Sequence, residues 1–211
     1  MGFVHLHNHS QYTILNGMPS PPAIVSAAEK LGMPAVAITD TCNLFGAVQF
    51  HKAAKKSPVK PIFGSEIWMW PKGIEDIKKV QRLKRAPDGG WHLNFLVQNK
   101  VGYHNLSKLI TEGIYHGIHY RPRIDWELLE AHAEGLMVTT SGLNGPLGYA
   151  LAQKNTDTTA HDILERLANI FGEDRLFLEL QDFAIPNQPQ LNTLARQMAD
   201  TLGLKTVVTN D

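Results

Sequence analysis

The sequence is poor in cysteine, because Cys42 is the only one among 211 residues. A single thiol cannot form an internal disulfide or supply a CxxC zinc motif, which fits a protein of the reducing cytoplasm. Net charge is also lacking, since 20 Lys and Arg residues balance 20 Asp and Glu residues. The chain as a whole therefore lacks the basic character of a protein that binds duplex nucleic acid alone, and any such contact must be local.

Long apolar runs are absent as well. No stretch approaches the roughly 18 apolar residues that suggest a membrane-spanning helix. The opening residues, Met1 to His5, lack the basic region and the apolar stretch of a secretory signal. The sequence also has no Gly-rich phosphate loop and no G-x-S-x-G nucleophile turn, so those enzyme classes are not indicated. We expect a cytoplasmic protein that does not enter a membrane.

Short β-branched runs alternate with longer amphipathic stretches, which predicts βα units around a parallel sheet. At this length, one domain covering residues 1–211 can bury its own core. The pattern predicts strands at Phe3–His9, Ala35–Thr39, Pro61–Trp68, Trp91–Val97, Gly135–Thr140, Arg175–Leu180 and Lys205–Thr209. It predicts helices from the Ser20 N-cap to Gly32 and at Ala47–Lys56, Val101–Gly113, Asp125–His132, Pro146–Ala152, Thr158–Phe171 and Pro189–Leu202.

One segment interrupts this alternation. Residues Lys72 to Arg85 contain six Lys or Arg side chains and lead into Ala86-Pro87-Asp88-Gly89-Gly90. A charge run of this kind is typical of a solvated loop or a short amphipathic helix, here between two strands. A contact with phosphate or with a partner protein is the alternative interpretation.

The motif His5-Leu6-His7-Asn8-His9 is the most informative short stretch of the chain. In an extended strand, alternation sends His5, His7 and His9 to one face, so imidazoles two residues apart can converge on one metal ion. An H-x-H motif alone is a weak signal, and a structural histidine cluster is the alternative.

Polar residues also lie late in other predicted strands or directly after them. Asp40 and Thr41 follow the second strand, Glu66 lies late in the third, and Asp211 follows the last. These places meet at the C-terminal rim of a βα barrel, where functional residues gather. Asp40 has an alternative role as the cap of the turn that follows it, whereas Glu66 is costly to bury among apolar neighbours without a partner. His92 lies at the start of its strand, and by itself is more typical of a core histidine.

Several segments taken together carry a more specific signal. They are Phe3 to Gly17, Leu31 to Asp40, Lys60 to Glu66, His92 to Asn99, Gly102 to Leu106, and Val207 to Asp211. In this order, which spans essentially the whole chain, they resemble the polymerase and histidinol phosphatase (PHP) domain of bacterial DNA polymerase III alpha subunits. The resemblance implies an α/β fold, a distorted (β/α)7 barrel, that stands at the N-terminus of a longer polymerase and is cut near its own C-terminal end.

The resemblance also implies a metal site. In metal-competent relatives nine side chains hold up to three ions, and five of these positions match here: His7, His9, Glu66, His92 and Asp211. Three positions differ, since Asn16 replaces an Asp, Thr41 a His, and Gly142 a Cys or His, while the ninth lies two residues after Asp211. Neutral Asn and Thr oxygens are poor ligands for Zn or Mn, and Gly has no side chain. We therefore expect at most one residual Zn, Mn or Mg ion, at His7, His9 and Glu66.

The resemblance implies that the parent protein is a DNA-directed DNA polymerase, a nucleotidyltransferase of DNA replication, and that this segment has no catalytic residues of its own. The leading hypothesis is a structural and interaction module, which docks the proofreading exonuclease subunit and meets DNA through the full-length polymerase. One alternative is a metal-dependent phosphoesterase or 3′-5′ exonuclease, in which metal-activated hydroxide attacks a phosphate ester. A free-standing histidinol-phosphatase-like enzyme is a weaker alternative, because the motifs are of the polymerase type.

Overall fold

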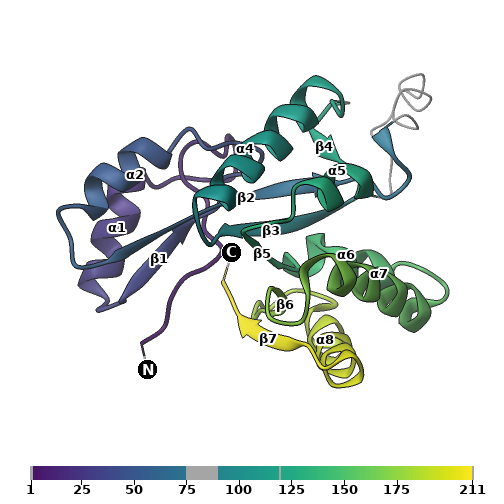
Figure 1. The fold of residues 1–211 in the computed structure, drawn as a ribbon. Helices are drawn as coiled ribbons and strands as arrows, with labels where there is room; N and C mark the ends of the chain where they lie inside the picture. Colours follow the sequence, from purple (N-terminus) through teal and green to yellow (C-terminus); the bar gives the residue numbers. More distant parts are fainter. Residues whose placement is uncertain (1, 75–89, 119, 211) are drawn as a thin grey trace.

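The computed structural model describes residues 2–74, 90–118 and 120–210. A mixed sheet curves into an open half-barrel, and helices cover its outer side (Figure 1). The strand order is β1-β2-β3-β5-β6-β7, and β4 pairs with β2 off this path. The expected distorted barrel of βα units is therefore confirmed.

The strands agree with the hydrophobic pattern except in two places, one at the start of the chain and one in the middle. The sheet contains β1 (Ala35–Ile38), β2 (Lys60–Met69), β3 (Trp91–Val97), β4 (Arg123–Ile124), β5 (Leu136–Thr139), β6 (Leu176–Leu180) and β7 (Lys205–Val208). The two-residue β4 was not predicted, because it is too short to show a period. The prediction of a parallel sheet is wrong for β3, which runs antiparallel to both β2 and β5.

The helices lie close to their predicted places. They are α1 (Pro21–Lys30), α2 (Ala47–Ala54), α4 (Lys100–Tyr115), α5 (Trp126–Ala131), α6 (Pro146–Leu151), α7 (Thr156–Phe171) and α8 (Gln188–Leu202), with a 3-10 turn η1 at Gly142–Asn144. Ser20 caps α1 as predicted, since its hydroxyl oxygen accepts a hydrogen bond from the Ala23 N–H at 3.4 Å. None of the helices in the described part of the chain is both long and apolar enough to cross a membrane.

The core has two parts on the helical side of the sheet. The larger cluster packs β2, β3, β5 and β6 against α4 to α8 and contains the fully buried Trp91, Phe95 and Phe171. The smaller cluster packs β1 against α1 and α2 around Phe50. The predicted core face of α1, Ile24, Val25 and Ala28, is buried in this second cluster.

The first predicted strand, Phe3–His9, is wrong, because only His5 makes a β-bridge, to Val36. The Ala37 N–H donates to His5 O, and the Thr39 N–H donates to Asn8 O. The two positions from Ala37 to Thr39 thus correspond to three positions, from His5 to Asn8, in the N-terminal segment, and one extra residue of this kind breaks a regular ladder. The predicted excursion at Lys72 to Arg85 falls outside the described residues from 75 onward.

Candidate metal centre

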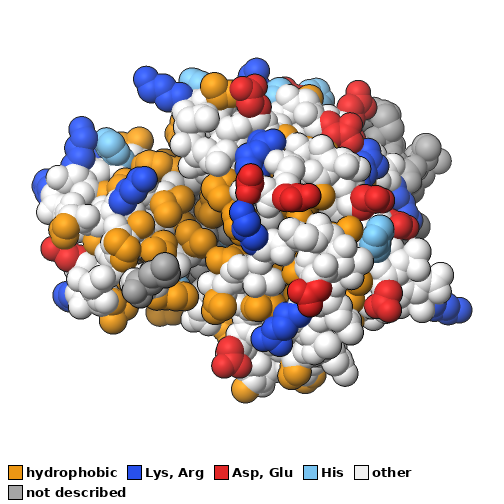
Figure 2. Space-filling view, turned by 60° about the horizontal axis from the view of Figure 1, so that its bottom comes forward, with side chains coloured by type: hydrophobic (Ala, Val, Ile, Leu, Met, Phe, Trp, Pro, Cys, Tyr) orange, Lys and Arg blue, Asp and Glu red, His pale blue; other side chains and the backbone are white. Residues whose placement is uncertain are grey.

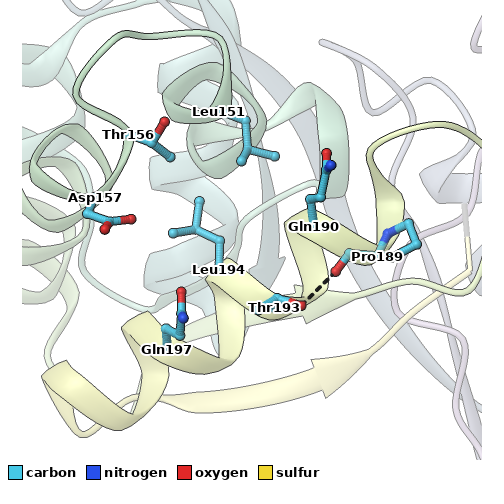
Figure 3. A pocket seen from close by; sticks show the side chains of 8 residues that line it. All are labelled: Leu151, Thr156, Asp157, Pro189, Gln190, Thr193, Leu194 and Gln197. Carbon is cyan, nitrogen blue, oxygen red and sulfur yellow. Dashed lines mark hydrogen bonds between the residues drawn. The ribbon is translucent and has the colours of Figure 1, made fainter.

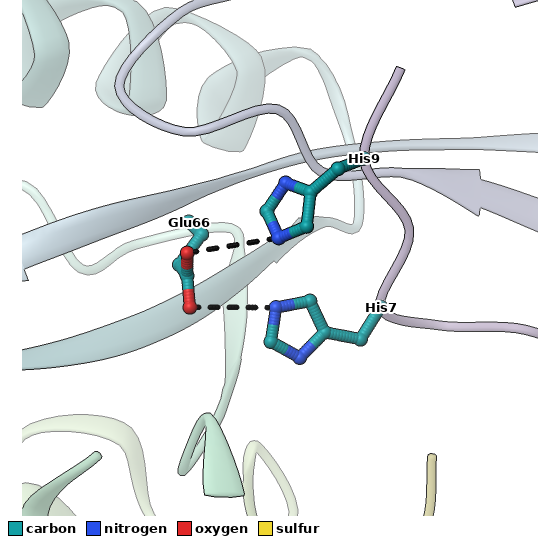
Figure 4. A group of neighbouring side chains, drawn as sticks. All are labelled: His7, His9 and Glu66. Atoms are coloured by element: carbon teal, nitrogen blue, oxygen red, sulfur yellow. Dashed lines mark ion pairs between the residues drawn. The ribbon is translucent and has the colours of Figure 1, made fainter. Parts of the chain in front are cut away.

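His7, His9 and Glu66 converge at the inner face of the half-barrel, although 57 positions separate His9 from Glu66 in the sequence. Their ligand atoms lie within 4.8 Å of one another. The two imidazoles approach from the N-terminal segment and face the carboxylate on β2 (Figure 4). His7 Nε2 lies 3.4 Å from Glu66 Oε1, and His9 Nε2 lies 3.7 Å from Glu66 Oε2. The predicted convergence of these three side chains is present.

His92 also lies beside Glu66, which the prediction of a parallel sheet did not suggest. Because β3 is antiparallel to β2, the start of β3 lies beside the end of β2, and Trp68 pairs with His92 while Glu66 pairs with Asn94. Residues diagonal to each other across such a pair share one face, so His92 Nδ1 comes within 2.7 Å of Glu66 Oε1. His5, in contrast, does not join: it lines a groove beside α1 together with Asn8. The prediction that His5 shares a face with His7 and His9 is wrong.

Asp40 does not line the pocket but anchors the loop that carries His9. Its carboxylate accepts hydrogen bonds of 2.7 Å from the Ser10 N–H, the Ser10 hydroxyl and the Thr13 hydroxyl. Thr13 Oγ1 in turn lies 3.2 Å from His9 Nδ1. The alternative considered for Asp40, a cap of the turn that follows it, is not what these bonds show. Its carboxylate instead caps the turn at Ser10 to Thr13, and Thr13 links that turn to His9.

Glu179 on β6 is a buried carboxylate that was not among the predicted site residues. It is fully buried, and its Oε2 lies 3.3 Å from His7 Nδ1. The Thr139 and Thr209 hydroxyls donate to its two oxygens, and Gln181 Nε2 donates to Oε2 at 3.3 Å. A charged residue in the middle of the apolar strand Leu176–Leu180 was the available signal, because an unpartnered buried carboxylate is rare.

These contacts set the charge state of the cluster. Burial by itself would lower the pKa of His7, but the carboxylates of Glu179 and Glu66 outweigh burial and hold the pKa of His7 well above its usual value. Burial likewise opposes ionisation of Glu66, yet hydrogen bonds from His7 and His92 hold the pKa of Glu66 below its ordinary value. Without an ion, a proton on His7 therefore supplies the positive charge between the two carboxylates.

The cluster opens into a polar pocket of about 280 Å³. Glu66 and His92 line this pocket, and so do two of the substituted positions, Asn16 and Thr41. The Thr41 hydroxyl donates to Glu66 Oε2 at 3.4 Å. Arg121 lies at the pocket as well, with its guanidinium carbon 4.5 Å from the centre of the Trp68 ring. No sequence signal marked Arg121, because it lies in an irregular segment before β4.

The third substituted position, Gly142, is filled by a neighbour. Its φ angle is +52°, and a Cβ built there would overlap the Gln181 side-chain oxygen. Gln181 thus takes up the space into which a longer side chain at Gly142 would extend. Asp211, the remaining predicted ligand, lies outside the described residues.

The donor set fits one divalent ion. Two imidazoles and one carboxylate are donors that Zn and Mn accept. His92 adds a buried Nε2 that has no hydrogen-bonding partner among the described residues, and a buried nitrogen of this kind is costly unless something binds it. In the described part of the chain, no other group of three His, Cys, Asp or Glu residues has this spacing.

Two other features of the described residues carry no comparable chemistry. Burial raises the pKa of the Cys42 thiol to about 12, so this cysteine is not a nucleophile at neutral pH. An open groove of about 330 Å³ lies between α8 and the chain around the start of α7 (Figure 3). Asp157 is its only charged side chain, and the Thr193 hydroxyl is used in a hydrogen bond to Pro189 O of 2.9 Å.

Comparison with known proteins gives a consistent result. The PHP domain family matches this chain over residues 5–183. DNA polymerase III subunit alpha of Treponema pallidum is 37% identical over 211 residues, covering 100% of this chain and 18% of the relative. The subunits from Borreliella burgdorferi and Thermus aquaticus are 37% and 36% identical, each over 99% of this chain and 18% and 17% of their own lengths. The chain thus spans less than a fifth of these relatives.

Solved structures share the fold at low sequence identity. One named as a metal-dependent phosphoesterase, from Bifidobacterium adolescentis, has a TM-score of 0.62 and 14% identity and covers 99% of this chain and 86% of its own. An amidohydrolase from Chromobacterium violaceum has a TM-score of 0.62 and 11% identity, with the same coverage. At these identities the likeness concerns the fold alone.

Proposed function

Because this chain belongs to the PHP domain family and is similar over its whole length to DNA polymerase III alpha subunits, we propose that residues 1–211 form one PHP domain that serves a cytoplasmic replicative polymerase as a structural and interaction module. The observation that carries this proposal is an intact pocket with a reduced ligand set. His7, His9 and Glu66 converge, while the neutral side chains of Asn16 and Thr41 line the same pocket.

The pocket holds at most one Zn, Mn or Mg ion in this proposal. His7, His9 and Glu66 would bind it, with His92 and Asp211 as the remaining candidate ligands. When bound, such an ion would polarise a phosphate oxygen or lower the pKa of a water molecule. The chain's own contribution is chiefly to join the N-terminal segment to β2, β3 and β6 through a single polar cluster.

The partners proposed are the proofreading exonuclease subunit and the remaining polymerase regions, with DNA bound through the full-length polymerase. Support for a docking surface comes from apolar side chains over the part of the molecule that holds α1, α2 and β1 (Figure 2). There a groove of about 210 Å³ is lined largely by apolar side chains of α1 and by Met33. Leu31 lines this groove and is 70% exposed, and Phe3, whose ring lies 4.8 Å from that of the groove residue His5, is 45% exposed. Apolar surface of this kind is typical of a protein interface.

The docking proposal is tested with the 211-residue chain and the exonuclease subunit of the same organism. We expect the two proteins to co-elute in size-exclusion chromatography, and Leu31→Asp to weaken the complex by at least tenfold. Tyr115→Asp is the matched control, because Tyr115 is 75% exposed but lies on α4. If both variants bind equally well, the interface does not include the groove beside α1. If the unchanged chain does not bind the exonuclease subunit, the proposal of this partner is wrong.

The alternative function is a metal-dependent phosphoesterase or 3′-5′ exonuclease. Its support is the surviving donor cluster, together with Arg121, whose charge could face a phosphate at the rim of the pocket. We expect negligible hydrolysis of a phosphomonoester or of single-stranded DNA in Mn, Zn or Mg, because several donors are replaced. Robust activity that disappears in His9→Ala would establish the enzyme instead.

A further inference from the structure

We infer that Thr13 and Glu179 are positioning residues, which hold the Nδ1 atoms of His9 and His7 so that both Nε2 atoms are directed at one ion beside Glu66. The inference deepens the proposed one-ion site and rests on it. Neither residue was among the expected ligands. Both touch an imidazole on the side away from Glu66.

The hydrogen bonds of Thr13 fix the tautomer of His9. The Thr13 hydroxyl proton goes to Asp40 Oδ1 at 2.7 Å, because a carboxylate only accepts. Thr13 Oγ1 then has two lone pairs, and one of them accepts from the Thr41 N–H at 3.1 Å. The other faces His9 Nδ1 at 3.2 Å, so Nδ1 must be the atom that carries a proton. In neutral His9 the lone pair therefore lies on Nε2, the atom that faces Glu66 Oε2.

Glu179 does the same for His7 from the opposite side. Its Oε2 accepts at His7 Nδ1, so this nitrogen keeps its proton while Nε2 points to Glu66 Oε1. Glu179 is itself immobilised, because Thr139, Gln181 and Thr209 all donate to its carboxylate. An ion that binds at Nε2 thus displaces only the outer proton of His7.

Fixed tautomers matter because an imidazole that presents a proton instead of a lone pair cannot bind a cation. Outer partners of this kind change metal affinity by roughly 10- to 100-fold when they are removed. We therefore expect Thr13→Val and Glu179→Gln each to weaken Zn binding to the 211-residue chain by at least tenfold, measured by competition with a chromophoric chelator.

Two controls separate positioning from general stability. Thr13→Ser keeps the hydroxyl and should bind Zn within about twofold of the unchanged chain. Thr140→Val removes the acceptor of the Glu179 backbone N–H, a 3.0 Å bond, while Thr13 beside His9 and the Glu179 carboxylate beside His7 are kept. It should lower thermal stability and leave Zn affinity unchanged. If Thr13→Val and Glu179→Gln bind Zn as tightly as these controls, the inference is wrong.

A spectroscopic readout without metal keeps the test independent of the proposed ion. In ¹⁵N-histidine spectra of the metal-free chain, assigned with His7→Gln and His9→Gln, neutral His9 should be protonated at Nδ1, and Thr13→Val should give a mixture of tautomers. The His7 Nδ1 proton should be visible downfield and should shift or vanish in Glu179→Gln. Failure of the unchanged chain to bind Zn would overturn the one-ion site alone, whereas unchanged spectra in both variants would overturn the positioning roles.

Discussion

Replacing Gly142 with alanine tests whether Gln181 occupies the space beside this glycine. The φ angle of +52° strains an L-residue by about 1–2 kcal/mol. The new Cβ would also displace Gln181, whose Nε2 donates to Glu179 at 3.3 Å and to Thr209 at 3.4 Å. At about 1 kcal/mol per hydrogen bond, Gly142→Ala should lower the free energy of unfolding by about 3–4 kcal/mol in urea denaturation.

Gly203→Ala is the matched control, because Gly203 has a φ angle of +68° but a Cβ there would meet no atom within 4 Å. It should lose only about 1–2 kcal/mol, from the backbone conformation alone. In a double-mutant cycle, Gly142→Ala and Gln181→Ala should be less than additive by about 2 kcal/mol, because both remove the same hydrogen bonds. Equal losses in the two glycine variants, with an additive cycle, would refute the proposed packing of Gln181.

Three further predictions concern the cluster and its attachment. Because the pKa of His7 is raised in the folded chain, protonated His7 stabilises the metal-free protein fully below pH 6.5. This stabilisation is lost as the pH rises through the raised pKa. In urea denaturation at several pH values, His7→Asn should therefore show a smaller loss of stability with rising pH. In a chain extended past Asp211 through the expected His, restoring Asn16→Asp and Thr41→His together with Gly142→Cys should raise the Zn- or Mn-dependent gain in melting temperature more than any single change. A combined variant that folds well but shows no such gain would mean that the pocket is not a reduced metal site. Asn94→Ala should speed proteolysis of the N-terminal segment, because Asn94 Nδ2 donates to Leu6 O at 3.1 Å, and an unchanged cleavage rate would contradict this role.

Local sequence signals determined most of the elements correctly. The Ser20 cap and the apolar spacing of Ile24, Val25 and Ala28 placed α1 and its buried face, because these interactions join residues within one or two turns. The places of His7, His9 and Glu66 near strand ends were also sufficient to predict their convergence, although the N-terminal segment is not a regular strand.

Strand direction and long-range contacts needed the tertiary structure. A hydrophobic period is the same for parallel and antiparallel strands, so the sequence could not reveal that β3 reverses and brings His92 to Glu66. An alternating pattern likewise does not show that the segment from His5 to Asn8 has one residue more than the segment from Ala37 to Thr39 that it pairs with. His5 therefore lines the groove beside α1 and not the pocket of the other two histidines.

The outer partners of the cluster were the least visible in the sequence. Thr13 meets His9 within the same loop, but Glu179 meets His7 across 172 positions, and Gln181, just after β6, fills the space at Gly142 in η1. The sequence by itself determined which residue types could bind a cation and that they lie in the N-terminal segment and late in β2. Only the tertiary structure decided which nitrogen of each imidazole faces inward, because that choice depends on hydrogen-bonding partners that the fold brings from other strands and loops.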